Sequence, residues 1–171
     1  MEKITVTKVD AAERQLRVAI RLFFEDRDPV AVHTLASAAA QVTADLMKAS
    51  GRTSIVRSAA IVREERRKEV RATMAAPEYF FKHADRDPAE AIEFNPETTE
   101  FFIYASLAEL QVLAGKIPRE GQVFQMWFLL KYDDMLLEND ATRVIRQALA
   151  AARNGGVSAE DKGDFLPLLG T

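Results

Sequence analysis

The two histidines are the residues best suited to chemistry near neutral pH, because the unperturbed pKa of histidine lies closest to 7. Each lies beside a copy of the same tetrapeptide. Asp26-Arg27-Asp28-Pro29 precedes His33, and His83 precedes Asp85-Arg86-Asp87-Pro88. Histidines close to carboxylates and an arginine suit proton transfer or metal binding. The candidate catalytic residues are therefore His83, His33, Asp85 and Arg27.

The same tetrapeptides also have a purely structural interpretation. An aspartate carboxylate accepts a free backbone N–H at the start of a helix, and the proline after it has no N–H to lose. Each copy therefore predicts a helix N-terminus, with Asp28 or Asp87 as the N-cap. A shared polar site, in which Arg27 or Arg86 pairs with carboxylates of the other copy, is the alternative.

His33 lies about one turn into its predicted helix, on the same side as Ala36 and Ala40. It is therefore either a histidine hydrogen-bonded within the helical core or a catalytic group. A metal site could combine His33, His83 and Asp85, but no two of these ligands are spaced to share one helix face. The chain has no cysteine and no glycine-rich phosphate loop, so we expect no metal and no other cofactor.

The charges are distributed unevenly, with a basic segment from Gly51 to Arg71 and an acidic one from Asp85 to Glu138. A stripe of arginines suited to phosphates runs along the helix predicted over the basic segment. The candidate nucleic-acid contacts are Lys82 and this stripe, Arg63, Arg67 and Arg71. The partner that they suit is RNA or a nucleotide. Glutamates interrupt the stripe, and a plain solvent-exposed face is the alternative interpretation.

Length and composition are those of an ordinary globular protein with one domain. The chain has 171 residues, of which 48% are hydrophobic and 29% charged, and this length is sufficient for a buried core. Its apolar runs are far shorter than the roughly 18 residues that indicate a membrane span. With no targeting signal recognisable, we expect a cytoplasmic protein without a membrane partner.

Helical periodicity predicts an all-α, single-domain bundle of about six or seven helices. Residues 4–9 alternate in polarity, as a short strand or an extended lead-in would, and residues 157–171 form a docked or loose extension. Asp87-Pro88 and Asn95-Pro96 mark additional helix starts. The predicted helices span residues 9–24, 29–49, 54–74, 78–84, 96–114, 119–137 and 141–153.

The predicted helix over residues 119–137 is apolar on most of its sides. Such a helix is buried either in its own domain or in an interface with a partner. We expect a homodimer formed through this helix, and a monomer that covers the helix by itself is the alternative.

Two stretches resemble signature stretches of a little-characterised family of small helical bacterial proteins. They are Asp28-Pro29-Val30-Ala31-Val32-His33-Thr34-Leu35-Ala36 and Tyr79-Phe80-Phe81-Lys82-His83-Ala84-Asp85-Arg86-Asp87-Pro88. The all-α build is also similar to HEPN-type bundles, which are nucleotide- or RNA-associated. This resemblance implies a dimeric helical bundle, with Arg27, His33, Lys82 and His83 as the residues to test.

Active HEPN ribonucleases carry an arginine, four to six residues and then a histidine. Arg27 and His33 match this spacing with five residues between them, although Pro29 lies inside the interval. His83 departs from the pattern, because the nearest arginine before it is Arg71, twelve positions earlier.

The leading functional hypothesis is a non-enzymatic binding or regulatory protein, HEPN-like and associated with nucleic acid. The first alternative is an enzyme, either a HEPN-like ribonuclease or a hydrolase, that uses His33 or His83 with nearby carboxylates. The second alternative is a bundle that binds a small ligand between its helices, with Trp127 and Tyr132 along the walls of the pocket.

Overall fold

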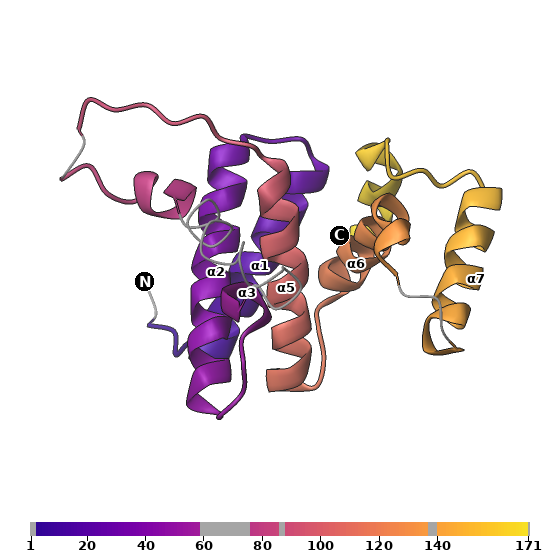
Figure 1. The fold of residues 1–171 in the computed structure, drawn as a ribbon, viewed down its shortest axis with the longest axis horizontal. Coiled ribbons are helices and arrows are strands. Elements are labelled where there is room, and N and C mark those ends of the chain that lie inside the picture. Colours follow the sequence, from indigo (N-terminus) through magenta and orange to yellow (C-terminus); the bar gives the residue numbers. More distant parts are fainter. Residues whose placement is uncertain (1–2, 59–75, 86–87, 137–139, 171) are drawn as a thin grey trace.

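The chain folds into an all-α helical bundle, which confirms the predicted fold class. The computed structural model describes residues 3–58, 76–85, 88–136 and 140–170, and none of these residues belongs to a β-strand. Three long helices stand side by side in Figure 1, namely α1 (Lys8–Phe24), α2 (Pro29–Ala49) and α5 (Glu97–Ala114). To one side of them lie α6 (Arg119–Lys131) and α7 (Asp140–Asn154). Within the described residues, no helix is both long enough and apolar enough to cross a membrane.

Helices α1 and α2 begin close to where the sequence predicts. Thr7 and Asp10 form a capping box at the start of α1, in which each side chain accepts a backbone N–H of the other residue. At the start of α2, the Asp28 carboxylate accepts the Ala31 N–H, and Pro29 is the first helical residue. The first tetrapeptide is therefore a helix cap, as predicted. The described residues before α1 form a non-helical lead-in and not a strand.

The core lies on both sides of α2, which packs against α1 and against α5. On α2, the small residues Ala36, Ala39 and Ala40 are fully buried, and their size lets the neighbouring helices approach closely. The larger buried side chains come from the helices on either side. Burial of each such side chain stabilises the fold by roughly 1.5–3 kcal/mol. They include Leu16, Ile20 and Phe24 of α1 and Phe102, Ile103 and Leu107 of α5.

The second tetrapeptide does not start a helix, so this prediction is wrong. Residues 88–96 form turns and extended chain, and the next helix begins at Glu97. The Asn95 side chain accepts the Glu97 N–H and so provides the cap instead. A helix of about seven residues from Pro88 would be marginal, because forming the first turn is unfavourable. Phe94 packs instead against the His33 ring, with 4.9 Å between ring centroids.

Three other predicted elements have different bounds. Residues 76–80 are helical, but the chain turns at Phe81, so the segment predicted over 78–84 ends early. Helix α6 ends at Lys131 and not at residue 137, and a 3₁₀ turn follows over Asp133–Met135. Of the helix predicted over 54–74, the described residues contain only α3 (Ile55–Ser58). Arg63, Arg67 and Arg71 lie outside the described residues.

The C-terminal extension is docked on the bundle. Its 3₁₀ helix η3 (Lys162–Leu169) packs against α1 and α6. The fully buried Phe165 ring stacks on Phe24, with 5.4 Å between centroids. The Arg119 side chain donates a hydrogen bond to the Leu168 carbonyl oxygen at 2.7 Å. This docking brings the start of η3 next to the turn that joins α1 to α2.

A fully buried carboxylate, that of Glu109, joins three helices. One of its oxygens accepts the Thr43 hydroxyl of α2 at 2.7 Å. The other accepts the Ser54 hydroxyl at 2.7 Å and the Ile55 N–H at 2.6 Å, at the start of α3. Glu109 is thus an N-cap for α3 that comes from α5, and it binds α2 as well.

We expect Glu109→Gln to lower the free energy of unfolding by about 1–3 kcal/mol, because an amide offers one acceptor oxygen where the carboxylate offers two. Urea denaturation monitored by circular dichroism measures this change. Thr43→Val removes a single donor and should cost about 1 kcal/mol. A Glu109→Gln variant as stable as the unchanged protein would contradict this role.

Candidate functional site

Two adjoining hollows form a groove where the end of α6 meets the start of α5, the α1–α2 turn and η3. The larger hollow, of about 780 Å³, has walls from Trp127, Leu130, Arg153 and residues 156–160. The smaller one, of about 500 Å³, has walls from both the α1–α2 turn and the first turn of α5. Three residues line both hollows, namely Glu100, Lys131 and Lys162. We call the two hollows together the groove.

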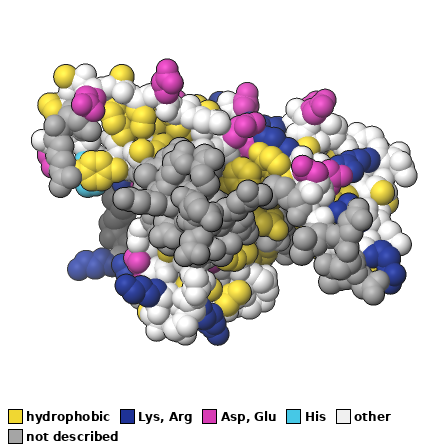
Figure 2. Space-filling view, viewed as in Figure 1, with side chains coloured by type: hydrophobic (Ala, Val, Ile, Leu, Met, Phe, Trp, Pro, Cys, Tyr) yellow, Lys and Arg dark blue, Asp and Glu magenta, His cyan; other side chains and the backbone are white. Residues whose placement is uncertain are grey.

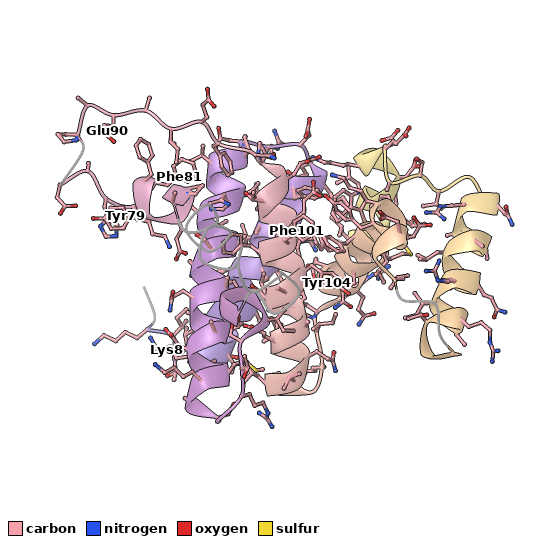
Figure 3. The ribbon with its side chains drawn as sticks, in the orientation of Figure 1. Lys8, Tyr79, Phe81, Glu90, Phe101 and Tyr104 are labelled. Carbon is pink, nitrogen blue, oxygen red and sulfur yellow. The ribbon has the colours of Figure 1, made fainter. Side chains whose placement is uncertain are left out.

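The helices that carry the groove are held together by aromatic side chains. Phe101 and Tyr104 extend from α5 toward α6 (Figure 3). The Tyr104 ring stacks on Phe128 with 4.2 Å between centroids, and Phe101 meets the same ring edge-on. On the wall of the larger hollow, the Trp127 indole N–H donates to the Ala159 carbonyl oxygen at 3.0 Å. These contacts hold α5, α6 and the chain around Ala159 together at the groove.

Lys131 and Glu100 form the fixed polar part of the groove. The Lys131 ammonium lies 2.9 Å from both Glu100 carboxylate oxygens, and the Tyr132 hydroxyl donates to one of them at 2.8 Å. Burial acts to lower the pKa of Lys131, but the Glu100 carboxylate outweighs it and raises that pKa above its usual value. Burial and the same carboxylate raise the pKa of Tyr132 to about 12.

Lys162 is the second cation that borders both hollows. Its ammonium lies 4.1 Å from the centroid of the Phe23 ring and 3.1 Å from an Asp26 carboxylate oxygen. The Asp26 side chain is 86% exposed, so this ion pair is largely solvated. Asp26 also has a φ of 53°, in the left-handed region that aspartate tolerates better than most residues.

Arg27, a candidate from the sequence, lines the smaller hollow. Its guanidinium Nε lies 3.1 Å from a Glu25 carboxylate oxygen, and both side chains are substantially exposed. Arg153 has a similar position at the larger hollow, where it pairs with the exposed Asp133 and donates to the Leu130 carbonyl oxygen. Each hollow is therefore bordered by one arginine, Arg27 at the smaller hollow and Arg153 at the larger.

His33 is fully buried behind the wall of the groove. A 2.9 Å hydrogen bond joins its Nδ1 to the hydroxyl of Thr99, and Thr99 lines the smaller hollow. Three phenylalanine rings surround the imidazole, and its Nε2 has no hydrogen-bond partner in the described part of the chain. Burial lowers the pKa of His33 to about 4, so the ring is neutral at physiological pH. The phenylalanines are Phe81, Phe94 and Phe102.

His83, Lys82 and Asp85 lie on an exposed arm, residues 76–85, that projects from the bundle (Figure 1). The His83 ring stacks on Tyr79 with 4.5 Å between centroids. Lys82 pairs with Glu78 one helical turn earlier, with 3.3 Å between the charged atoms. The arm meets His33 through Phe81, whereas His83 stays on the surface.

The structure therefore separates the residues that the sequence grouped together. Arg27 borders the groove, His33 lies behind the groove wall, and Lys82, His83 and Asp85 are on the arm. Among the described residues, no group of three or more histidine, aspartate or glutamate side chains is placed to hold a metal ion.

Sequence reasoning missed the polar residues of the groove, Glu100, Lys131 and Lys162. No local motif marks these residues, because they come together only in the folded chain. Lys162 and Asp26, for example, are 136 positions apart in the sequence. Trp127 lines the larger hollow, whereas Tyr132 lines neither hollow and donates a hydrogen bond to Glu100, which lines both.

Comparison of the chain with protein-family models, curated proteins and solved structures finds no match. The chain is therefore described by its fold and its groove, as an all-α bundle with a groove lined by charged and apolar side chains.

The buried His33 makes stability depend on pH. The folded-state pKa of about 4 lies below the usual 6.5, so the unfolded chain takes up the proton first as the pH falls. The free energy of unfolding should therefore decrease by up to about 3 kcal/mol between pH 6.5 and pH 4. His33→Gln should remove this component, as measured by urea denaturation at a series of pH values. His83→Gln, at the surface, should keep the full pH dependence; an equal effect of both variants would contradict the assignment.

Proposed function

We propose that the chain is a cytoplasmic, non-enzymatic binding protein that holds a small ligand in the groove. The observation that carries this proposal is the groove itself, whose two hollows meet at Lys131 and Lys162. Its larger hollow has the size of typical small-molecule sites, which range over about 300–1,000 Å³. Its walls combine the apolar side chains of Trp127, Leu130 and Val157 with five charged residues. Small-molecule sites likewise place polar groups among apolar walls.

Binding is favoured over catalysis by the protonation states of three groups in the groove, next to it or behind its wall, namely Lys131, Tyr132 and His33. General acids and bases work best when their pKa lies near the working pH. Here the pKa of His33 is about 4 and that of Tyr132 about 12, and the pKa of Lys131 is raised. These groups keep one protonation state across the neutral range. The enzymatic alternative, with His33 as the acid or base, has correspondingly little support.

Occupation of the groove should be visible in tryptophan fluorescence, because Trp127 is the only tryptophan and lies on the groove wall. We expect a screen of small polar metabolites to yield ligands that change this emission. At a concentration of 100 Kd, such a ligand should raise the free energy of unfolding by about 2.7 kcal/mol.

A variant with a filled groove provides the control. Ala159→Leu adds bulk at the wall of the larger hollow, and it should abolish both the fluorescence change and the stabilisation. The matched variant Ala148→Leu, on the exposed face of α7, should bind as the unchanged protein does. Ligands that bind Ala159→Leu undiminished, or a screen without any ligand, would refute the groove as the functional site.

Association with RNA is the second candidate function, and it rests on the arm. Aromatic side chains next to a basic residue can stack and hold single-stranded bases. The stacked rings of Tyr79 and His83 beside Lys82 supply such a surface, which agrees with the resemblance to HEPN-type bundles. The local charge opposes it, because Glu78, Asp85 and Glu90 are on the same stretch, and acidic side chains recur along the upper edge of the face in Figure 2.

Fluorescence anisotropy of a labelled mixed-sequence single-stranded RNA tests this second candidate. Binding should weaken steeply between low and moderate salt if phosphates are contacted. Tyr79→Ala should weaken binding about five- to 100-fold if a base stacks on the ring. Lys82→Ala should reduce the salt dependence, whereas Lys48→Ala at the end of α2 serves as the charge-matched control. RNA binding that is absent at low salt would exclude this function.

The homodimer also stays a proposal. The most apolar residues of α6, including Phe124, Trp127 and Phe128, are buried within a single chain. The alternative of a self-covered monomer therefore accounts for this helix, and a dimer would have to use another surface. Sedimentation of the purified chain at several concentrations measures which state exists.

A further inference from the structure

We infer that the ligand of the groove carries one small anionic group, of the phosphate monoester type, which Lys162 and Arg27 receive in place of the Asp26 and Glu25 carboxylates. This inference rests on the proposed binding function of the groove and names the class of its ligand.

The groove has two kinds of ion pair. Lys131 is held by Glu100, whose side chain is only 6% exposed, and this pair is part of the folded structure. The pair of Lys162 with Asp26 and that of Arg27 with Glu25 are solvated, and exposed pairs of this kind contribute only about 0–1 kcal/mol. An incoming anion can therefore displace Asp26 and Glu25 at little cost, but not Glu100.

Lys162 keeps its position without Asp26. Its ammonium lies over the Phe23 ring, and such a cation–π contact is worth about 0.5–1 kcal/mol at exposed sites. Docking of η3, with Phe165 in the core, fixes the backbone that carries Lys162. Asp26, by contrast, is on a surface turn with a left-handed backbone. The cation is thus built into the site, whereas its carboxylate partner is exchangeable.

The remaining groups limit the shape of the ligand. Lys162 and Arg27 line the smaller hollow and supply donors for an anion's oxygens. Glu97 and Glu100 line that hollow too, and they would repel a ligand with negative charge along its whole length. The larger hollow, with Trp127, Leu130 and Val157 in its walls, suits an uncharged body. The donors and walls together fit a phosphate group on a neutral organic molecule.

Adenosine 5′-monophosphate and adenosine form a probe pair that differs only in the phosphate, and pyrophosphate is the purely anionic probe. Binding is measured by Trp127 fluorescence and calorimetry at constant ionic strength. We expect the monophosphate to bind at least tenfold more tightly than adenosine. Asp26→Asn should raise this affinity about three- to tenfold by removing the competing carboxylate, because asparagine also tolerates the left-handed conformation. Lys162→Gln should lower it about tenfold, and Lys162→Arg should retain most of it.

The control is Asp45→Asn, which makes the same change of charge at an exposed position of α2 outside the groove. An equal gain in Asp26→Asn and Asp45→Asn would overturn the inference, because it would reflect net charge alone. Equal binding of adenosine and its monophosphate, or no binding of the monophosphate and pyrophosphate, would overturn it as well. The proposed function is tested separately by the metabolite screen. It fails if the screen finds no ligand, of any charge, whose binding is abolished by Ala159→Leu.

Discussion

The contact on which the groove depends is the one between the Lys131 ammonium and the Glu100 carboxylate. It joins the last residue of α6 to the first turn of α5, and the Tyr132 hydroxyl completes the set of donors to the same carboxylate. The Glu100 carboxylate is buried, so removing the Lys131 ammonium would leave a buried charge without its cation, which is costly. The end of α6 is therefore fixed, and with it the Leu130 carbonyl to which Arg153 donates. Because Lys131 and Glu100 line both hollows, this contact contributes to the walls of each.

Buried glutamates have the same connecting role elsewhere in the bundle. Glu120 of α6 accepts hydrogen bonds from Arg17 and Arg21 of α1, and Glu109 of α5 binds α2 and α3. Burial acts to raise the pKa of Glu120, but hydrogen bonds from its own backbone, Arg21 and Arg17 outweigh burial and lower it. Three acids of the acidic segment, Glu100, Glu109 and Glu120, thus connect helices. Part of the negative charge in the acidic segment therefore has a structural role inside the fold.

Local signals predicted the elements well where the physical cause was local. The Asp28-Pro29 cap, the periodicity of α1 and α2 and the small residues of α2 all act within a few residues, and the structure confirms them. The identical signal at Asp87-Pro88 failed, because a helix of about seven residues is marginal and Phe94 packs against His33 instead. His33 could be placed in the core from its helix face. Its partners Phe81 and Phe94 come from the arm and the chain after it, which periodicity does not locate.

The groove could not be predicted from local sequence signals, because its residues come from distant parts of the chain. Asp26 and Arg27 were noticed because they belong to a repeat, yet their neighbour Lys162 comes from the docked extension, which could equally have been loose. The docking of η3 against α1 and α6, with Phe165 stacked on Phe24, places this lysine beside the first tetrapeptide. The first tetrapeptide therefore has two roles. Asp28 starts α2, while Asp26 and Arg27 supply exchangeable charges to a site whose permanent charges are the half-buried Lys131 and the buried Glu100. A rigid frame combined with weakly paired surface charges is the arrangement that permits binding of an anion without rearrangement of the fold.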